Sequence, residues 1–175
     1  MTRRQLEHLI GAAATIADDD EIVVIGSQAV LGQFPDAAPE LLVSVEADLY
    51  PKNHPELADL IDGSIGELSP FHDTFGYYAQ GVGEETATLP RGWKERLVPV
   101  RSARTRGATG LCLEVHDLVV SKAVAGRDKD ARFIAAAVRL GMVSVPVVRE
   151  RLAATDLSDA ERAVVEGRLA ALEGA

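Results

Sequence analysis

The stretch that decides the fold covers residues 21–50 and reads EIVVIGSQAVLGQFPDAAPELLVSVEADLY. Its apolar run at 22–25 predicts a buried strand that ends in a Gly-Ser turn. The segment after the turn, 28–33, favours a short helix, and the prolines that follow favour a loop. Residues 41–50 then predict a second strand. We therefore expect a strand, a turn, a short helix, a loop and a strand in this order.

Two acidic residues stand two positions apart in the second predicted strand. Because side chains alternate between the faces of a strand, Glu46 and Asp48 project from the same face. Neighbouring carboxylates repel each other unless a cation or a shared proton relieves them. The pair is therefore a candidate metal site. Mg²⁺ would use such carboxylates together with substrate phosphate oxygens and several waters.

The turn that ends the first strand supplies the second half of this candidate site. Gly26 lets the backbone approach a ligand closely, and Ser27 opens the next helix, where free amides suit phosphate. A Gly-Ser turn is common in purely structural roles. The carboxylate pair on the following strand makes a functional role of the turn more convincing, because the unit then offers both a phosphate-binding turn and metal ligands.

Composition limits the classes of function. The 175 residues are 47% hydrophobic and 26% charged, which is ordinary for one globular domain. The formal net charge of −9 argues against non-specific wrapping of duplex nucleic acid, which needs a basic surface. Six basic residues do lie close together, and a solvated loop and strand edge is their commoner interpretation. They are Arg91, Lys94, Arg96, Arg101, Arg104 and Arg106.

Cysteine content and hydropathy bear on the compartment. Cys112 is the single cysteine, so no internal disulfide is expected, and no Cys/His spacing suggests zinc. No apolar run is long enough to cross a bilayer, and the first residues lack the apolar core of a signal peptide. These features predict a cytoplasmic protein that is not bound to a membrane.

The remaining segments complete the expected order of elements. Helical spacing predicts helices over 2–17, 56–65, 145–153 and 160–172, and one or more over about 118–140. Strands are expected over 75–80, 97–100 and 111–115, and a loop over 69–74. The aspartates at 18–20 favour a solvated turn over a metal site, and Tyr77 and Tyr78 favour core packing over stacking on a base.

Lys122 stands within an apolar helical run, and charged residues follow it at 127–130. If one helix is continuous through this region, Lys122, Gly126 and Lys129 share a face and Asp130 lies to its side. An exposed, solvated lysine is a strong alternative. The functional interpretation is a point charge that meets a polyphosphate.

The order of these motifs resembles that of small bacterial nucleotidyltransferases, and more closely the AbiEii-like abortive-infection toxins and their relatives. The resemblance rests on Gly26-Ser27, the acidic pair of residues 44–48, and Lys122 with residues 127–130, and it covers roughly residues 20–140. It implies an α/β or α+β fold, in which helices flank a mixed β-sheet. Residues 1–175 would form a single domain, with a sheet-containing core over about 20–113 and a helical region over about 114–175.

The resemblance also implies roles for individual residues. Gly26, Ser27, Lys122 and Lys129 would bind the triphosphate of a nucleoside triphosphate, and Glu46 and Asp48 would bind Mg²⁺ or Mn²⁺. Glu46, Asp48, Lys122 and Asp130 would be the catalytic set. Lys122 would neutralise phosphate charge, and Asp130 would be a further catalytic or positioning acid. Catalysis would then consist of charge neutralisation and in-line positioning.

Two departures from the family pattern stand out. The first metal acid is Glu46, where aspartate is the commoner choice, and its extra methylene moves the carboxylate. The third strand acid of the superfamily has no clear counterpart, and Glu114 on a later strand is the candidate. Both departures leave open a relative that binds nucleotide poorly or has lost activity.

Three hypotheses follow. The first is a metal-dependent nucleotidyltransferase that acts on an RNA, a tRNA end or a protein hydroxyl, with a toxin-like role as one form of it. The second is a catalytically inert protein of the same fold that binds a cognate protein partner, as an antitoxin or scaffold does. The first needs Glu46, Asp48 and Lys122 to converge on an accessible pocket, whereas the second allows them to be salt-bridged or scattered. A metal-dependent phosphohydrolase is disfavoured, since the histidines are isolated.

Overall fold

The computed structural model describes residues 1–173. Its chain divides into two compact units. The first, the sheet unit, consists of Met1–Thr86 and Leu97–Glu114. The second, the helical unit, consists of Ala87–Arg96 and the residues from Val115 onward. The prediction of a single domain stays a prediction.

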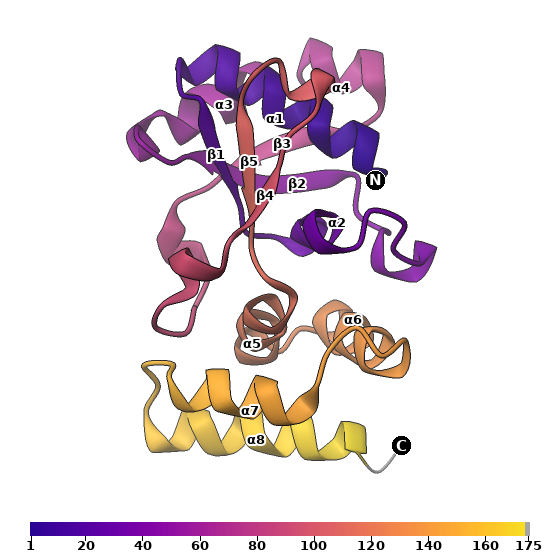
Figure 1. Cartoon of the computed structure of the whole chain (residues 1–175), viewed down its shortest axis with the longest axis vertical. Coiled ribbons are helices and arrows are strands. Elements are labelled where there is room, and N and C mark those ends of the chain that lie inside the picture. The colour runs from indigo at the N-terminus through magenta and orange to yellow at the C-terminus, as the bar shows by residue number, and fades with distance from the viewer. Residues whose placement is uncertain (174–175) are drawn as a thin grey trace. The chain divides into compact units, whose positions relative to one another are not determined.

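The sheet unit is built on five strands in the order β3-β2-β1-β5-β4 (Figure 1). In chain order these strands are β1 (Glu21–Val24), β2 (Glu46–Pro51), β3 (Tyr78–Gly81), β4 (Val98–Val100) and β5 (Thr109–Cys112). β1 pairs antiparallel with β2 and parallel with β5, and β2 pairs parallel with β3. The sheet is therefore mixed, as the sequence analysis expected, and the α+β fold class is confirmed.

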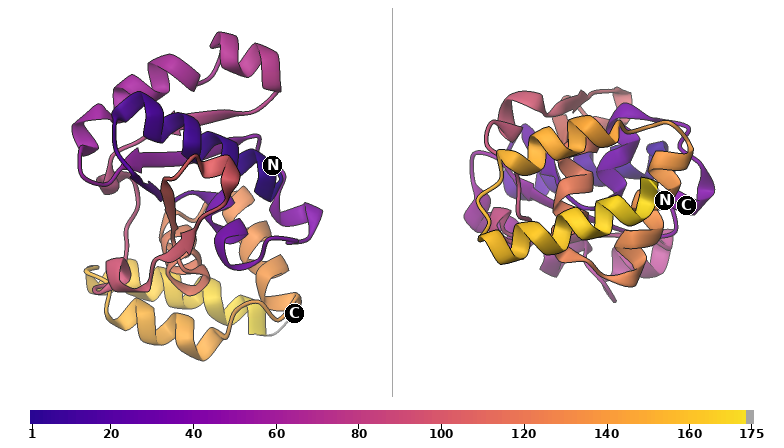
Figure 2. Two further views of the ribbon diagram at one scale, coloured as in Figure 1. Left: turned by 45° about the horizontal axis from the view of Figure 1, so that its top comes forward. Right: turned by 90° about the horizontal axis from the view of Figure 1, so that it is seen from below.

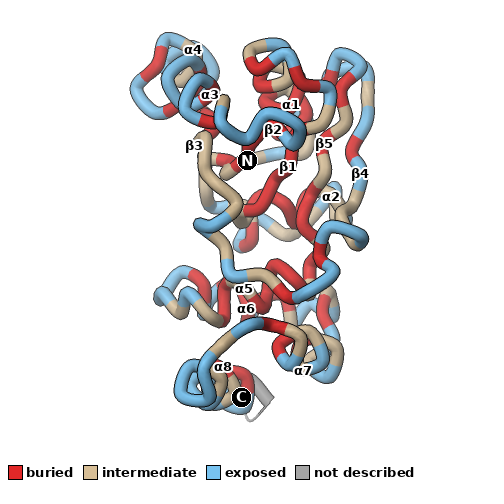
Figure 3. The backbone as a smooth tube through the Cα atoms, turned by 90° about the vertical axis from the view of Figure 1, so that its left-hand side faces the viewer, coloured by how far each residue is buried: buried red, intermediate tan, exposed pale blue. Residues whose placement is uncertain are grey.

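The first helix, α1 (Arg3–Ala17), begins at a capping box. The Thr2 hydroxyl accepts from the Gln5 backbone N–H, and the Gln5 side chain accepts from the Thr2 N–H at 2.7 Å. Its apolar stripe, including Leu6, Leu9 and Ile10, is fully buried. Gly110 on β5 makes room for this stripe, because a Cβ there would collide with Ile10. Figure 3 shows that most of β1 is buried.

Three further helices belong to the sheet unit: α2 (Val30–Gln33), α3 (Ala58–Ile65) and α4 (Pro70–Phe75). α3 packs on α1, β2 and β3, so α1 and α3 cover the same face of the sheet (Figure 2). α4 corrects the loop expected over 69–74. Ser69 caps this helix by accepting from the His72 N–H, and Pro70 occupies its first turn.

The strand expected over 75–80 begins later than predicted. Phe75 still belongs to α4, and Gly76 ends that helix with a φ of 74°. Glycine adopts this left-handed conformation without steric cost. β3 therefore starts only at Tyr78.

Four helices form most of the helical unit: α5 (Val115–Ala125), α6 (Asp128–Arg139), α7 (Val145–Ala153) and α8 (Asp159–Glu173). α5 and α6 are separate, so the continuous helix considered for residues 118–140 is wrong. Gly126 interrupts it with a φ of 64°, and Arg168 of α8 donates to the Ala123 carbonyl at the end of α5 (2.6 Å). α7 and α8 pack side by side (Figure 2), and Arg149 and Glu166 join them at 3.2 Å.

The aspartate run at 18–20 is not simply a solvated turn. Asp19 is 5% exposed, and its carboxylate accepts from the backbone N–H groups of Glu21, Asn53 and His54 and from the Asn53 side chain. Burial opposes its ionisation, but these hydrogen bonds outweigh burial and lower the pKa of Asp19. The residue thus fastens the start of β1 to the segment after β2.

Within residues 1–173, none of the helices combines the length and apolar character that crossing a bilayer requires.

Candidate active site on the sheet

The Gly-Ser turn and the acidic strand lie side by side at one end of the sheet. Val24, at the end of β1, pairs with Leu49 of β2, and the Ile25 N–H donates to the Asp48 carbonyl at 3.0 Å. This pairing sets Gly26 against the Asp48 side chain. A Cβ built on Gly26 would collide with the carboxyl group of Asp48 and approach its Cβ. Only glycine leaves this carboxylate its observed position.

Glu46 and Asp48 occupy the same face of β2, as their spacing predicts. Both are partly exposed, whereas Ala47 and Leu49 between and beside them are buried. The alternation follows from the pleat of the strand. The two carboxylates therefore stand together on the face opposite to the one that α1 and α3 cover.

Tyr78 on the neighbouring strand holds Glu46. The parallel register pairs Glu46 with Tyr78, and the Tyr78 hydroxyl donates to Glu46 Oε2 at 3.0 Å. Burial, this hydrogen bond and the negative charges of Glu46, Glu67 and Asp48 raise the pKa of Tyr78 to about 12. The hydroxyl consequently stays protonated at neutral pH and orients one carboxylate oxygen.

A second layer supports Tyr78. The His72 ring lies against the Tyr78 ring, with 4.6 Å between the centroids, and His72 Nδ1 accepts from the Leu68 N–H at 3.1 Å. Sequence analysis assigned Tyr78 to core packing and did not find this role. Its position at the start of a strand that pairs in parallel with β2 is a long-range feature, and no local motif signals it.

The turn itself continues into a short 3₁₀ helix over Ser27–Ala29. The Ala29 N–H donates back to the Gly26 carbonyl at 2.9 Å. Gln28 follows Ser27 and is fully buried, yet in the described part of the chain neither polar atom of its side-chain amide has a hydrogen-bond partner. A buried amide without partners is costly, so this residue marks a place where a water or a ligand is expected.

The other predicted site residues lie in the helical unit, where they form an ion cluster. Lys122 Nζ is 2.9 Å from Asp130 Oδ1, and Arg127 Nε is 2.6 Å from Asp130 Oδ2. Lys122 also lies over the Phe133 ring, 4.6 Å from its centroid. Asp130 is fully buried and Lys122 is 6% exposed. The solvated lysine considered as an alternative is therefore wrong.

Burial and pairing act in opposite directions on this cluster. Burial lowers the pKa of Lys122, although the hydrogen bond from Lys122 to Asp130 favours the charged lysine. For Asp130, burial alone would raise the pKa, but the hydrogen bonds from Arg127 and Lys122 outweigh it and lower the pKa. The aspartate is thus ionised at neutral pH. Lys129, by contrast, is exposed on α6.

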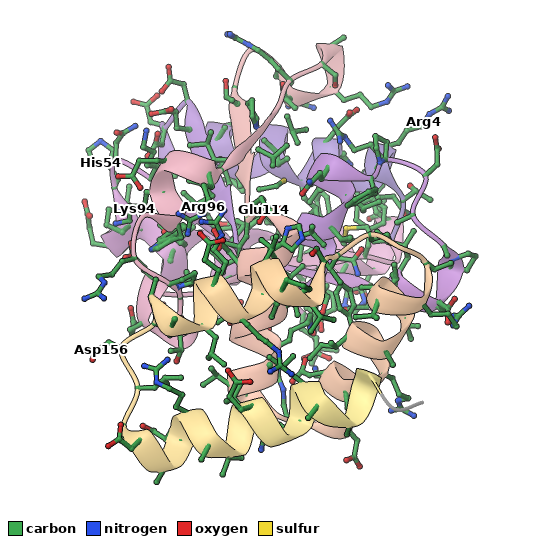
Figure 4. The ribbon with its side chains drawn as sticks, turned by 60° about the horizontal axis from the view of Figure 1, so that its bottom comes forward. Arg4, His54, Lys94, Arg96, Glu114 and Asp156 are labelled. Carbon is green, nitrogen blue, oxygen red and sulfur yellow. The ribbon has the colours of Figure 1, made fainter. Side chains whose placement is uncertain are left out.

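The structure brings the predicted residues together in two groups. Gly26, Ser27, Glu46 and Asp48 meet within the sheet unit, and Lys122 and Asp130 meet within the helical unit. The strand expected over 111–115 ends at Cys112, so Glu114 lies two residues beyond β5 and not on a strand. The Leu113 N–H donates to the Val24 carbonyl at 2.9 Å, so Glu114 lies at the same end of the sheet as Gly26. It is among the side chains labelled in Figure 4.

The donor set at this end of the sheet suits a hard cation. The oxygens of two carboxylates are suitable ligands for Mg²⁺ or Mn²⁺, and both ions also bind phosphate oxygens and water. Gly26 keeps the space beside Asp48 clear of a side chain. Among the residues that the structure describes, no three His, Cys, Asp or Glu side chains form a group that could hold a metal ion. A cation here would depend on substrate oxygens for the rest of its shell.

Comparison with known proteins yields one family. The model of a family described as "Nucleotidyltransferase of unknown function" (DUF6036) matches residues 4–166. No curated protein and no solved structure matches the chain. The matched range includes both the β2 carboxylates and the Lys122–Asp130 pair.

Proposed function

The chain belongs to the DUF6036 family of nucleotidyltransferases, and on that premise we propose that it transfers a nucleotide from a nucleoside triphosphate to an acceptor hydroxyl. The hydroxyl oxygen forms a bond to the α-phosphorus, the bond from that phosphorus to the bridging oxygen breaks, and pyrophosphate leaves. The hydroxyl proton passes to water. We further propose that the acceptor is an RNA, a tRNA end or a protein hydroxyl in the bacterial cytoplasm, as in the AbiEii-like toxins.

One observation carries this proposal: the Asp48 carboxylate rests against the bare Cα of Gly26, with Glu46 beside it on the same strand face. A glycine whose Cβ would displace a carboxylate has a reason beyond turn formation. A structural turn would tolerate alanine here, because Gly26 has an ordinary φ of −82°. With no side chain on Gly26, the Asp48 carboxylate lies next to the backbone of the turn, which supports a joint role of the two.

The residues of the sheet unit then take distinct roles. Glu46 and Asp48 would hold Mg²⁺ or Mn²⁺, and the backbone of Gly26 and Ser27 would bind oxygens of the triphosphate. The metal, when bound, supplies positive charge that offsets the charge on the phosphates. Tyr78 fixes the direction of Glu46 by its hydrogen bond of 3.0 Å. Such support of a metal-binding carboxylate raises affinity without touching the substrate.

The proposed phosphate contact of Lys122 requires a change in its ion pair. The charge of Lys122 is balanced by Asp130 at 2.9 Å, and Asp130 also receives Arg127. Lys122 could meet a triphosphate only by sharing or leaving Asp130, which costs free energy in a buried pair. Lys129 is exposed, so no buried ion pair would have to change for it to bind phosphate.

This ion cluster favours a second candidate function. In a catalytically inert member of the family, Lys122 and Asp130 would stabilise the helical unit and no triphosphate would bind. The protein would then act by binding a protein partner, as an antitoxin or a scaffold does. The absence, over the described residues 1–173, of a third acid grouped with Glu46 and Asp48 points the same way.

Calorimetric titration separates the two. ATP, CTP, GTP and UTP would each be titrated into the wild type and the Asp48→Asn variant, with and without Mg²⁺. The transferase proposal expects a component of triphosphate binding that requires both Mg²⁺ and Asp48, and the nucleotide with the strongest such component identifies the donor. If no triphosphate shows this component, the transferase proposal fails and the inert function stands. Asp59→Asn, which changes an exposed aspartate on α3, is the matched control.

A further inference from the structure

A hollow lies in the sheet unit, on the face opposite to the β2 carboxylates. Its volume is about 380 Å³, within the range of pockets that hold small organic ligands. Two segments far apart in sequence contribute its charged walls: the start of α1 and the turn before β5. The lining includes Arg4, Gln5, His8, Tyr77, Arg104 and Arg106.

Successive residues at the entry to β3 connect the two faces. Tyr78 turns toward Glu46, whereas Tyr77 turns toward α1, where its hydroxyl and His8 Nδ1 are 2.8 Å apart. The His8 ring is held in turn by Phe71 and Phe75, whose centroids lie 5.2 Å and 4.9 Å away. The aromatic wall of the hollow is therefore braced from behind, and its rings are fixed in place.

Carboxylates of the protein compensate little of the positive charge of the hollow. In the part of the chain that the structure describes, the guanidinium groups of Arg4 and Arg106 have no hydrogen-bond or ion-pair partner, and both residues are exposed. Figure 4 shows Arg4 at the outer edge of the molecule. Arg104 approaches a carboxylate, that of Glu7, only at 4.0 Å. Like charges collected in one hollow repel each other unless an anion joins them.

Glu7 cannot supply that anion. Its carboxylate is buried and already accepts from Arg3 Nε at 3.0 Å and from the Ser102 hydroxyl at 2.9 Å. The chain as a whole has a net charge of −9, so three arginines in one hollow run against its general balance. Arg106 ends the short 3₁₀ helix Ala103–Thr105 with a φ of 54°, and its N–H donates to the Ala103 carbonyl.

We propose that this arginine hollow binds a nucleotide unit, with its phosphate on Arg4 and Arg106 and its base against the partly exposed His8 ring, which the buried Tyr77 supports. Arginine guanidinium groups bind phosphate through paired hydrogen bonds, and bases stack on aromatic side chains without regard to sequence. The unit can belong to a single-stranded RNA or be a free mononucleotide. This binding needs no metal and does not depend on the proposed transfer reaction.

The test is fluorescence anisotropy with a short, labelled single-stranded RNA in EDTA at low salt, which leaves metal-dependent nucleotide binding out of the measurement. We expect the Arg4→Ala/Arg106→Ala double variant to weaken binding on the order of tenfold. The salt slope should fall by about one for each phosphate that the variant no longer neutralises. Arg91→Ala, which removes an exposed arginine outside the hollow, should bind like the wild type.

Competition with AMP identifies the source of the nucleotide. Displacement of the RNA by AMP assigns the hollow to single nucleotides, and RNA binding that AMP does not displace assigns it to a strand. The proposal is overturned if neither the RNA nor AMP binds, or if Arg91→Ala weakens binding as much as the double variant does. Thermal unfolding of all variants serves to verify the fold. Because the substituted residues Arg4, Arg91 and Arg106 are all exposed, we expect unchanged unfolding midpoints.

Discussion

The carboxylates of the two units are held in different ways. On β2, Glu46 and Asp48 are partly exposed, and the protein gives Glu46 a neutral hydroxyl donor, that of Tyr78. In the helical unit, Asp130 is fully buried and receives two cations, Lys122 and Arg127. The first contact orients Glu46 without neutralising its charge. The second neutralises its charge within the protein.

This contrast shows how a charged motif should be interpreted. Two acidic residues side by side repel each other, and a metal that binds between them relieves this repulsion. An acid that is already paired with two cations gains little from a further ligand. Removing such an acid leaves a buried cation without its counter-charge. The β2 pair is therefore suited to binding, and the Lys122–Asp130 pair is suited to holding α5 and α6 together. Each variant below removes one side of this contrast.

The largest effect is expected from Asp130→Ala. This variant leaves Lys122 buried without its counter-charge, and breaking a buried pair in this way costs about 3–5 kcal/mol in the free energy of unfolding. Chemical denaturation measures the loss. Lys129→Ala, an exposed residue one position away, should change stability by no more than about 0.5 kcal/mol. Equal stability of the two variants would contradict the structural role of the cluster.

Gly26→Ala is expected to come next. Its Cβ collides with the Asp48 carboxyl group, so the strand must shift or the side chain must turn away, at about 1–3 kcal/mol. If the proposed function holds, magnesium-dependent nucleotide binding falls as far as in Asp48→Asn. Gly63→Ala is the matched control, since nothing lies within 4 Å of the added Cβ on α3. Alanine there should stabilise the helix by about 0.5–1 kcal/mol.

The acid sensitivity of the fold tests the same contrast by pH. Although burial opposes it, pairing lowers the pKa of Asp130 below its ordinary value of 3.8, so in this range the unfolded chain binds more protons than the folded one. The contribution of Asp130 is therefore present above that value and is lost as pH falls through the lowered folded pKa. Each unit of lowering corresponds to about 1.4 kcal/mol. Denaturation curves between neutral and acid pH should show a flatter profile for Asp130→Asn.

Asp128→Asn provides the control for that experiment. Asp128 lies in the first turn of the same helix and is exposed. Its substitution should leave the acid limb of the wild-type profile in place. An acid limb that is unchanged in Asp130→Asn would show that the buried cluster does not govern stability at low pH.

The sequence predicts the fold better than it predicts the contacts of the site. Local patterns sufficed for α7, found at its predicted bounds of 145–153, and for the Ser158 capping box of α8, where the Glu161 side chain accepts from the Ser158 N–H at 2.9 Å. The second strand is shorter than expected. β2 begins only at Glu46, and the carbonyls of Leu42 and Ser44 accept from the amino group of Met1 (2.8 and 3.0 Å).

The site was predictable where its residues are neighbours on adjacent strands. A strand, a Gly-Ser turn and the next acidic strand fold into one local unit, which brought Gly26 to Asp48. The environment of Lys122 was not predictable, because Gly126 turns the chain so that Asp130 of the next helix folds back onto it. The role of Tyr78 depends on pairing between strands that are separated by two helices, and periodicity carries no such information.

The smallest effect on stability is expected from Tyr78→Phe. Loss of the hydroxyl removes one hydrogen bond to the partly exposed Glu46, at about 0.5–1.5 kcal/mol. If the proposed function holds, the carboxylate loses its orientation and magnesium-dependent nucleotide binding weakens by about tenfold, the lower end of what supporting residues of metal ligands contribute. Calorimetry at several Mg²⁺ concentrations would separate a loss of metal affinity from a loss of nucleotide affinity.

Tyr50→Phe is the matched control for Tyr78→Phe. Tyr50 lies on the same strand as Glu46, and its hydroxyl also donates to a glutamate, Glu84, at 3.3 Å. The two variants remove the same atom and a similar hydrogen bond, but only Tyr78 serves the acidic pair. Equal weakening in both would mean that tyrosine hydroxyls stabilise the sheet in general. Weakening confined to Tyr78→Phe would mean that the hydroxyl orients Glu46 for the metal, which is the feature that the Asp130 cluster lacks.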